Sequence, residues 1–192
     1  LFLLAAGLTL VFGIMDMVNL AHGSLYMMGA YFAAVFTEWT GSFFLGAALA
    51  LPAGALLGIA VELIALRTLY TRDHLDQVLA TFGLILFFNE LARLMFGAGG
   101  MTIQTPDWLQ GQIMVLPGLP YPSYRFLIIL VGLLCAAFLY VLVQRTRLGM
   151  LIRAGASNRE MVGALGINIK QLFTLVFGLG SALAALDGLM AG

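Results

Sequence analysis

Four stretches of this sequence are apolar for about twenty residues each and nearly free of charge. They are residues 43–66, 78–97, 126–143 and 172–192. A helix rises 1.5 Å per residue, so about 20 apolar residues cross the ~30 Å hydrocarbon core of a bilayer. The whole chain is 62% hydrophobic and 9% charged, against about 45–50% and about 25% in soluble domains. The sequence therefore predicts an all-α, polytopic transmembrane helical bundle embedded in a lipid bilayer.

The beginning of the chain is apolar but interrupted. Residues 1–18 and 24–37 are apolar except for Asp16, and the polar, glycine-containing run 19–23 separates them. Short hydrophobic segments around such a break are typical of either a re-entrant hairpin or a discontinuous helix. We therefore expect about five to six membrane segments in total, with the first one or two short or broken.

The basic residues are distributed unevenly, although the formal net charge is zero. Seven of the nine lie in two loops, residues 67–77 and 144–171. The positive-inside rule predicts that both loops are cytoplasmic, which places residues 98–125 outside. Zero net charge gives no field that would attract nucleic acid. One cysteine and two histidines exclude a disulfide framework and a Cys/His zinc cluster, so we expect neither a metal nor a cofactor.

The loop 144–171 contains a predicted short helix. Ser157 and Glu160 have the spacing of a capping box, which predicts a helix that begins at Asn158. Gly166 would end it in the left-handed conformation. A helix of about two turns is unstable alone in water, so it must pack against something. It is either a docking element for a cytoplasmic partner or an interfacial helix on anionic headgroups.

Polar residues in apolar surroundings give the candidate substrate pathway. Asp16, Asn19, His22 and Ser24 surround the first break, and ionisable groups inside a membrane segment are usually retained because they face a cavity or a partner. The alternative is that Asp16 and His22 lie at a membrane surface, with Ser24 capping the next helix.

A second polar group lies near the outer end of the segment 78–97. Asn89, Glu90 and Arg93 are close in sequence, and the three-residue spacing of Glu90 and Arg93 allows them to pair on one helix face. They are either a structural pair or part of the pathway lining. Glu62 and Arg67, at an inner boundary, are interpreted as anchors that snorkel to the interface.

Several motifs resemble those of one transporter family. Residues 7–13 read GLTLVFG, residues 18–23 read VNLAHG and residues 26–31 read YMMGAY, while residues 148–158 read LGMLIRAGASN and residues 164–168 read ALGIN. Together they closely resemble permease subunits of branched-chain amino acid ABC importers of the LivH type. The resemblance extends over essentially all 192 residues, and it identifies one transmembrane permease domain, 1–192, that is a fragment of a longer permease.

The resemblance implies a function and a set of partners. The chain would be a multi-pass subunit of the bacterial inner membrane, with a second homologous permease, two cytoplasmic ATP-binding subunits and a periplasmic substrate-binding protein. It would not be an enzyme, would have no catalytic residues and has no Walker A loop. Urea or amide importers and an ion-coupled secondary carrier are the alternatives. The residues expected in the ATPase-coupling segment are Arg153, Ala154, Asn158, Arg159, Glu160, Gly163, Leu165 and Gly166.

Overall fold

The computed structural model describes residues 1–17, 19–97, 99, 101, 106, 109, 111–116 and 119–191. Val18, which belongs to the family motif, and most of the predicted outer loop between 98 and 110 lie outside these residues. The elements are α1 (Phe2–Met15), α2 (His22–Thr40), α3 (Phe43–Ile64), η1 (Leu66–Leu69), α4 (His74–Phe96), β1 (Gln112–Leu116), β2 (Leu119–Pro122), α5 (Ser123–Arg145), α6 (Arg147–Ser157), α7 (Arg159–Ala164) and α8 (Ile169–Ala191).

The predicted fold class is confirmed. The four apolar stretches form the long helices α3, α4, α5 and α8, each long and apolar enough to cross a membrane. Their ends differ by a few residues from the predicted ends, because helices continue past the last apolar residue. The strands β1 and β2 add an antiparallel two-stranded ribbon, which the sequence did not predict. The protein is therefore a polytopic bundle of apolar helices.

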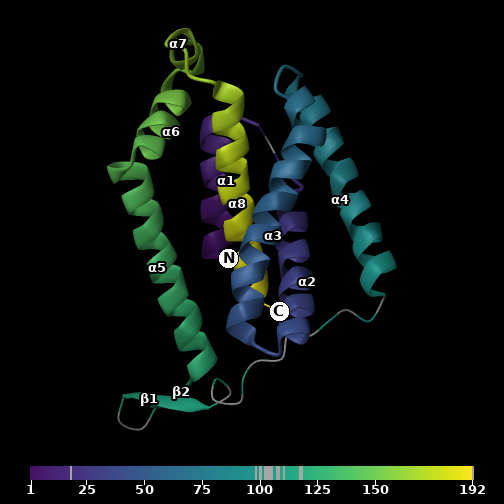
Figure 1. Cartoon of the computed structure of the whole chain (residues 1–192), viewed down its shortest axis with the longest axis vertical. Coiled ribbons are helices and arrows are strands. Elements are labelled where there is room, and N and C mark those ends of the chain that lie inside the picture. Colours follow the sequence, from purple (N-terminus) through teal and green to yellow (C-terminus); the bar gives the residue numbers. More distant parts are fainter. Residues whose placement is uncertain are drawn as a thin grey trace.

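Helix α8 lies at the centre of the bundle (Figure 1). It packs against α1, α2 and α3, and most of its residues are buried. In contrast, α5 runs along one flank with Ser123 as its one buried residue, and α4 lies on the other flank. The two basic loops lie at the same end of the bundle, and the ribbon β1–β2 lies at the opposite end. We call the end with η1, α6 and α7 the basic end.

Small residues allow α3 and α8 to approach closely. The buried positions of α3 include Gly46, Ala50, Gly54 and Gly58, spaced four apart on one helix face. A Cβ atom at Gly54 would overlap Ala185 of α8, and one at Gly58 would overlap Ser181. Lipid tails are as apolar as leucine, so helix association in a membrane depends on such van der Waals contact between small residues. This contact is the main packing interaction of the bundle.

The chain reverses direction between α1 and α2. Asp16 ends α1 in the left-handed conformation, with φ at 50°, and its amide donates to the Phe12 carbonyl at 2.9 Å. His22, the first residue of α2, lies beside Gly7 in the first half of α1. The described residues of the segment between them, 16, 17 and 19–21, which we call the link, therefore lead back toward the first half of α1. Of the two predicted arrangements, the structure contains the hairpin rather than one interrupted helix.

The close packing predicts a penalty for one methyl group. We expect Gly58→Ala to lower stability by about 1–3 kcal/mol, because overpacking forces the surrounding side chains and backbone to shift. The matched control is Gly83→Ala in α4, where nothing lies within 4 Å of the added Cβ. Alanine has the higher helix propensity, so the control should be at least as stable as the parent. Thermal unfolding in detergent measures both, and a Gly58→Ala protein as stable as the control would contradict the packing.

Candidate functional site

The polar residues predicted around the first break come together at the link and at the start of α2. Asn19, His22 and Ser24 are all buried between the helices, whereas Asp16 lies at the basic end with an exposed side chain. The Asn19 side-chain oxygen accepts from the Ala21 amide at 3.1 Å, which supports the turn into α2. Irregular backbone at membrane depth persists only where protein or water satisfies it. Met17, Asn19 and Ala21 of the link meet this condition because they are buried in the bundle.

Two of these buried side chains have polar atoms without an ordinary hydrogen-bond partner. Among the described residues, neither the Asn19 amide nitrogen nor either ring nitrogen of His22 forms a hydrogen bond of ordinary geometry, apart from a weak contact of the His22 ring with the Leu4 backbone. A buried polar group without a partner is costly, so such groups usually contact water or a ligand. The site therefore offers donors and an acceptor to a small polar molecule inside the bundle.

The second predicted polar group does not join this site. Asn89, Glu90 and Arg93 lie on an exposed face of α4, on the flank of the bundle. Although both residues are described, Glu90 and Arg93 make no ion pair with each other, so the expected pairing was wrong. The sequence spacing permits contact on one helix face, but exposed side chains gain little by giving up their conformational freedom to pair.

The loop 144–171 folds into two helices rather than one. The helix α6 follows directly on α5 and is capped by Thr146, whose hydroxyl accepts from the Gly149 amide at 3.1 Å. The helix α7 begins one residue later than predicted, with Asn158 as its cap. The Asn158 side chain accepts from the Met161 amide at 2.9 Å, so the expected Ser157 cap was wrong. An asparagine caps a helix as well as a serine does, and Ser157 instead ends α6.

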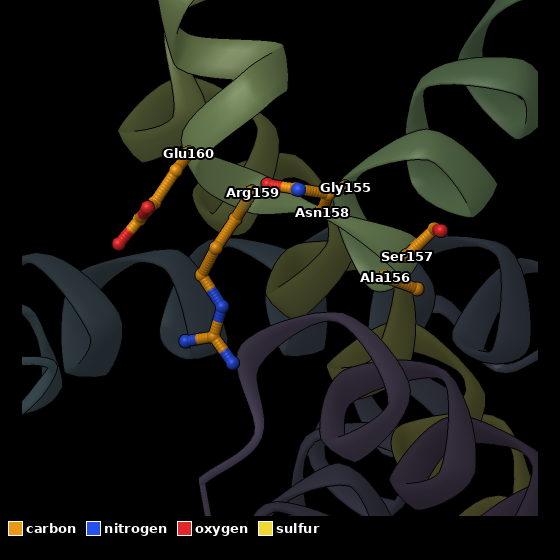
Figure 2. Close-up of a pocket in the computed structure, with 6 residues that line it drawn as sticks. All are labelled: Gly155, Ala156, Ser157, Asn158, Arg159 and Glu160. Atoms are coloured by element: carbon orange, nitrogen blue, oxygen red, sulfur yellow. The ribbon is translucent and has the colours of Figure 1, made fainter.

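All residues of the predicted ATPase-coupling segment are exposed at the basic end. Their positions run from Arg153 in α6 to Gly166 after α7. Gly166 has φ at 83°, which confirms the predicted left-handed terminator. The turn between the two helices forms an open pocket of about 450 Å³, lined by Gly155, Ala156, Ser157, Asn158, Arg159 and Glu160 (Figure 2).

The surface of α7 is apolar as well as exposed. Met161 is 60% exposed and Leu165 is 73% exposed, while Val162 packs inward. An exposed apolar pair on the basic end is unusual because the basic residues indicate an aqueous surface there. The surface is therefore suited to contact with another protein. Arg153 turns the other way, and its guanidinium donates to the Val143 carbonyl at the end of α5.

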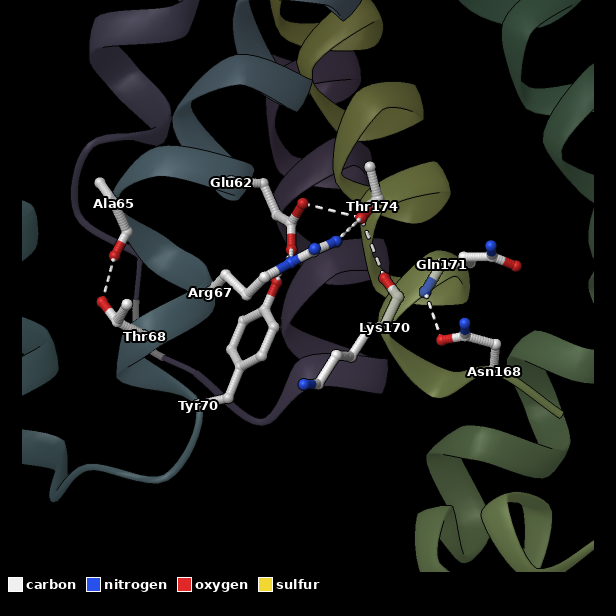
Figure 3. A network of polar contacts seen from close by, with 9 residues as sticks. All are labelled: Glu62, Ala65, Arg67, Thr68, Tyr70, Asn168, Lys170, Gln171 and Thr174. Carbon is white, nitrogen blue, oxygen red and sulfur yellow. Dashed lines mark hydrogen bonds and ion pairs between the residues drawn. The ribbon is translucent and has the colours of Figure 1, made fainter. Parts of the chain in front are cut away.

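A buried carboxylate at the basic end was missed by the sequence interpretation. Glu62 is fully buried, and it accepts from the hydroxyls of Tyr70 at 2.5 Å and Thr174 at 2.7 Å (Figure 3). Arg67 lies 3.5 Å from the same carboxylate and also donates to Thr174 at 3.1 Å. We call these four residues the Glu62 network. The expected snorkelling of Glu62 was wrong, because Glu62 continues the four-residue spacing of the small residues and so faces α8.

The Glu62 network connects three elements. It joins the end of α3, the segment that follows η1, and α8. Burial, followed by the hydrogen bond to Glu62, raises the pKa of Tyr70 above its usual value, so the phenol remains a donor. Every oxygen of the carboxylate has a partner, which indicates a structural role. No group of three potential metal ligands occurs within the described part of the chain.

Loss of the Glu62 carboxylate should destabilise the protein. Glu62→Ala removes the acceptor of the half-buried Tyr70 hydroxyl and the ion pair of Arg67, while the Thr174 hydroxyl keeps the Lys170 carbonyl as an acceptor, and we expect a loss of about 1–3 kcal/mol. Glu38→Ala at the exposed end of α2 is the control, with an expected change within about 0.5 kcal/mol. Thermal unfolding in detergent compares them. Equal melting temperatures for the two variants would show that the network contributes nothing to stability.

The sequence was compared with known proteins. Residues 1–192 match the family described as "Branched-chain amino acid transport system / permease component". The chain is 30% identical to the high-affinity branched-chain amino acid permease BraD of Pseudomonas aeruginosa and 28% identical to LivH of Escherichia coli K12, in each case over 99% of this chain. A probable LivH of Methanocaldococcus jannaschii is 27% identical over 98% of it.

These matches cover 66%, 65% and 61% of the respective relatives, so the chain spans about two thirds of their length. No solved structure matches it. The family match covers the whole sequence, and the apolar helices agree with a multi-pass membrane protein. The chain therefore belongs to the family of branched-chain amino acid transport permeases.

Proposed function

We propose that this chain is the membrane-spanning permease subunit of a bacterial ABC importer that moves branched-chain amino acids into the cytoplasm. The family membership and the printed names of the relatives support this assignment. The observation that carries the proposal is the basic end, where all residues of the expected ATPase-coupling segment lie exposed on α6, α7 and the turn after α7. A partner protein can reach this surface without entering the bundle.

The proposed assembly places ATP hydrolysis in separate subunits. The given sequence contains no Walker A motif, which is consistent with that division. The proposed partners are two cytoplasmic ATP-binding subunits, a second homologous permease and a periplasmic substrate-binding protein, in the inner membrane. The basic end faces the cytoplasm in this arrangement, in agreement with the positive-inside rule. The exposed Met161 and Leu165 form the centre of the proposed ATPase contact.

The proposed substrate pathway passes the link. Asn19 and His22 are buried and have free hydrogen-bonding capacity, and Ser24 lies two residues further into α2. A zwitterionic amino acid that crosses an apolar bundle needs such groups to replace part of its hydration. Asp16 belongs to the basic end of this pathway. Asn89, Glu90 and Arg93 would contribute only where α4 meets the second permease, because they are exposed on the flank.

Reconstitution of the full-length complex tests the transport function. In vesicles that contain ATP, the complex should accumulate labelled leucine when the binding protein is present, and a protonophore or a sodium ionophore should not stop it. Accumulation that follows an ion gradient without ATP would instead establish a secondary carrier. Preferential uptake of urea or an amide would establish the related importer class.

The same assay tests the coupling surface. Gly163→Glu and Leu165→Glu place bulky charged side chains on the exposed surface of α7, and we expect each to reduce ATP-dependent uptake by about tenfold or more, as for a lost interface contact of about 1.4 kcal/mol. Trp39→Glu makes a comparable change at an 85% exposed position on the opposite end. It should leave copurification of the ATPase unchanged. Normal uptake by both α7 variants would contradict the coupling role.

The proposed role of Asn19 in the pathway is tested by replacing it with leucine, a side chain of similar size. Asn19→Leu removes the unpartnered amide nitrogen from the interior and also the oxygen that accepts from the Ala21 amide, so its two effects on stability oppose each other. Leucine uptake per assembled complex should fall. If uptake is unchanged, Asn19 is only a poorly satisfied core residue.

A further inference from the structure

The helix α7 contacts the end of α1 through one side chain. The Arg159 guanidinium extends from α7 toward the end of α1, as Figure 2 shows. Its Nη2 atom lies 3.3 Å from the Asp16 carboxylate, and its Nη1 atom donates to the Met15 carbonyl at 3.4 Å. Arg159 and Met15 are 144 positions apart in the sequence. The contact therefore joins the coupling segment to the pathway segment, which the sequence presents as separate features.

The chemistry of this contact favours an arginine. The last carbonyls of a helix have no partner within the helix and carry partial negative charge. Asp16 adds a full negative charge at the same place, in a left-handed conformation that starts the link. The planar guanidinium fork can serve both acceptors at once, whereas a lysine ammonium is a single point charge. The neighbouring Glu160 points away from α1 (Figure 2).

Apart from this contact, α7 is held lightly. It has six residues, of which Val162 is the buried one, and its other neighbours are α6 and the beginning of α8. A helix of this length is not stable by itself. In contrast, α8 is packed along its length against α1, α2 and α3. A force on α7 would therefore shift α7 relative to the bundle more readily than it would shift α8.

The link is the part of the bundle that such a shift can deform. The described residues of the link, 16, 17 and 19–21, are not helical, and Asn19 lies three positions after Asp16 in the same short segment. Both members of the ion pair are partly exposed, at 42% for Arg159 and 66% for Asp16. Exposed pairs form and break readily because water competes for both charges. Such a pair suits a contact that is remade in each transport cycle.

We propose that Arg159 is a positioning residue that connects α7 to the link, so that ATP-driven displacement of α7 shifts Asn19 and His22. The proposal rests on the proposed function and adds to it the residue through which the movement passes. Asn19 lies on the same short segment as Asp16, and His22 begins the helix that follows it, so a small displacement at Asp16 would change their position. Arg159 itself need not touch the substrate.

A double-mutant cycle in the full reconstituted complex tests this connection. The single variants are Asp16→Asn, which keeps a residue that tolerates the left-handed conformation, and Arg159→Gln. The readout is the number of leucine molecules transported per ATP hydrolysed. Each single variant should lower this ratio about two- to fivefold, the range of an exposed ion pair. The double variant should be no worse than the worse single variant, because both remove the same contact.

Two further variants distinguish a specific role of Arg159 in connecting α7 to the link from the effect of losing any exposed arginine. Arg159→Lys keeps the positive charge, so we expect it to transport more leucine per ATP hydrolysed than Arg159→Gln does. Arg147→Gln removes an exposed arginine of α6 that has no ion pair among the described residues, and it should leave the ratio unchanged. Copurification of the ATPase and the melting temperature should stay close to the parent values in every variant.

The proposal is overturned by an unchanged ratio in both single variants, or by effects that multiply in the double variant. It is also overturned if Arg159→Gln lowers the ratio only through loss of bound ATPase. These outcomes leave the transport function intact, because the parent complex still accumulates leucine with ATP. Absence of ATP-driven uptake in the parent complex would refute the proposed function, and the proposed role of Arg159 as well.

Discussion

The close contact between α3 and α8 is the constraint on which the rest of the structure depends. In a bilayer no hydrophobic force drives helices together, so their association requires close van der Waals packing. Gly54 and Gly58 allow this by bringing the α3 backbone against Ala185 and Ser181. The same small-residue face of α8 receives α2, where a Cβ at Gly29 would overlap Ala185. The result is a fixed body of α1, α2, α3 and α8, with α4 and α5 on its flanks.

Buried polar residues in this body are of two kinds, and their hydrogen bonds distinguish them. The carboxylate of Glu62 has partners on both oxygens and ties α3 to α8 at the basic end. The side chains of Asn19 and His22 are as deeply buried but retain unused hydrogen-bonding atoms. A satisfied group contributes to rigidity, whereas an unsatisfied one is costly in the absence of water or a ligand. This contrast indicates a structural role for the first and is consistent with the proposed pathway role of the second.

The arrangement at the basic end combines a rigid part and a movable part. The Glu62 network anchors one side of it, while α7 stands above the bundle on short connections. Energetic coupling between distant sites requires an element with two arrangements that both sites can bias. In the proposed coupling, the lightly packed α7 and the link would be this element, beside the fixed body of the bundle. The ion pair between Arg159 and Asp16 lies between them.

The sequence by itself determined the class of fold, the common end of the two basic loops and the glycine that terminates α7. These depend on local properties, namely the length of apolar runs, charge and backbone conformation at Gly166. It did not determine which residues meet across helices. Three features depend on neighbours that are distant in the chain. They are the exposure of Glu90 and Arg93 on α4, the burial of Glu62 and the reversal at Asp16. By local sequence, either Ser157 or Asn158 could cap α7, and the position at which α6 ends decides between them. Only the tertiary structure decides such choices, because burial and pairing are properties of two surfaces in contact and a sequence pattern describes one surface at a time.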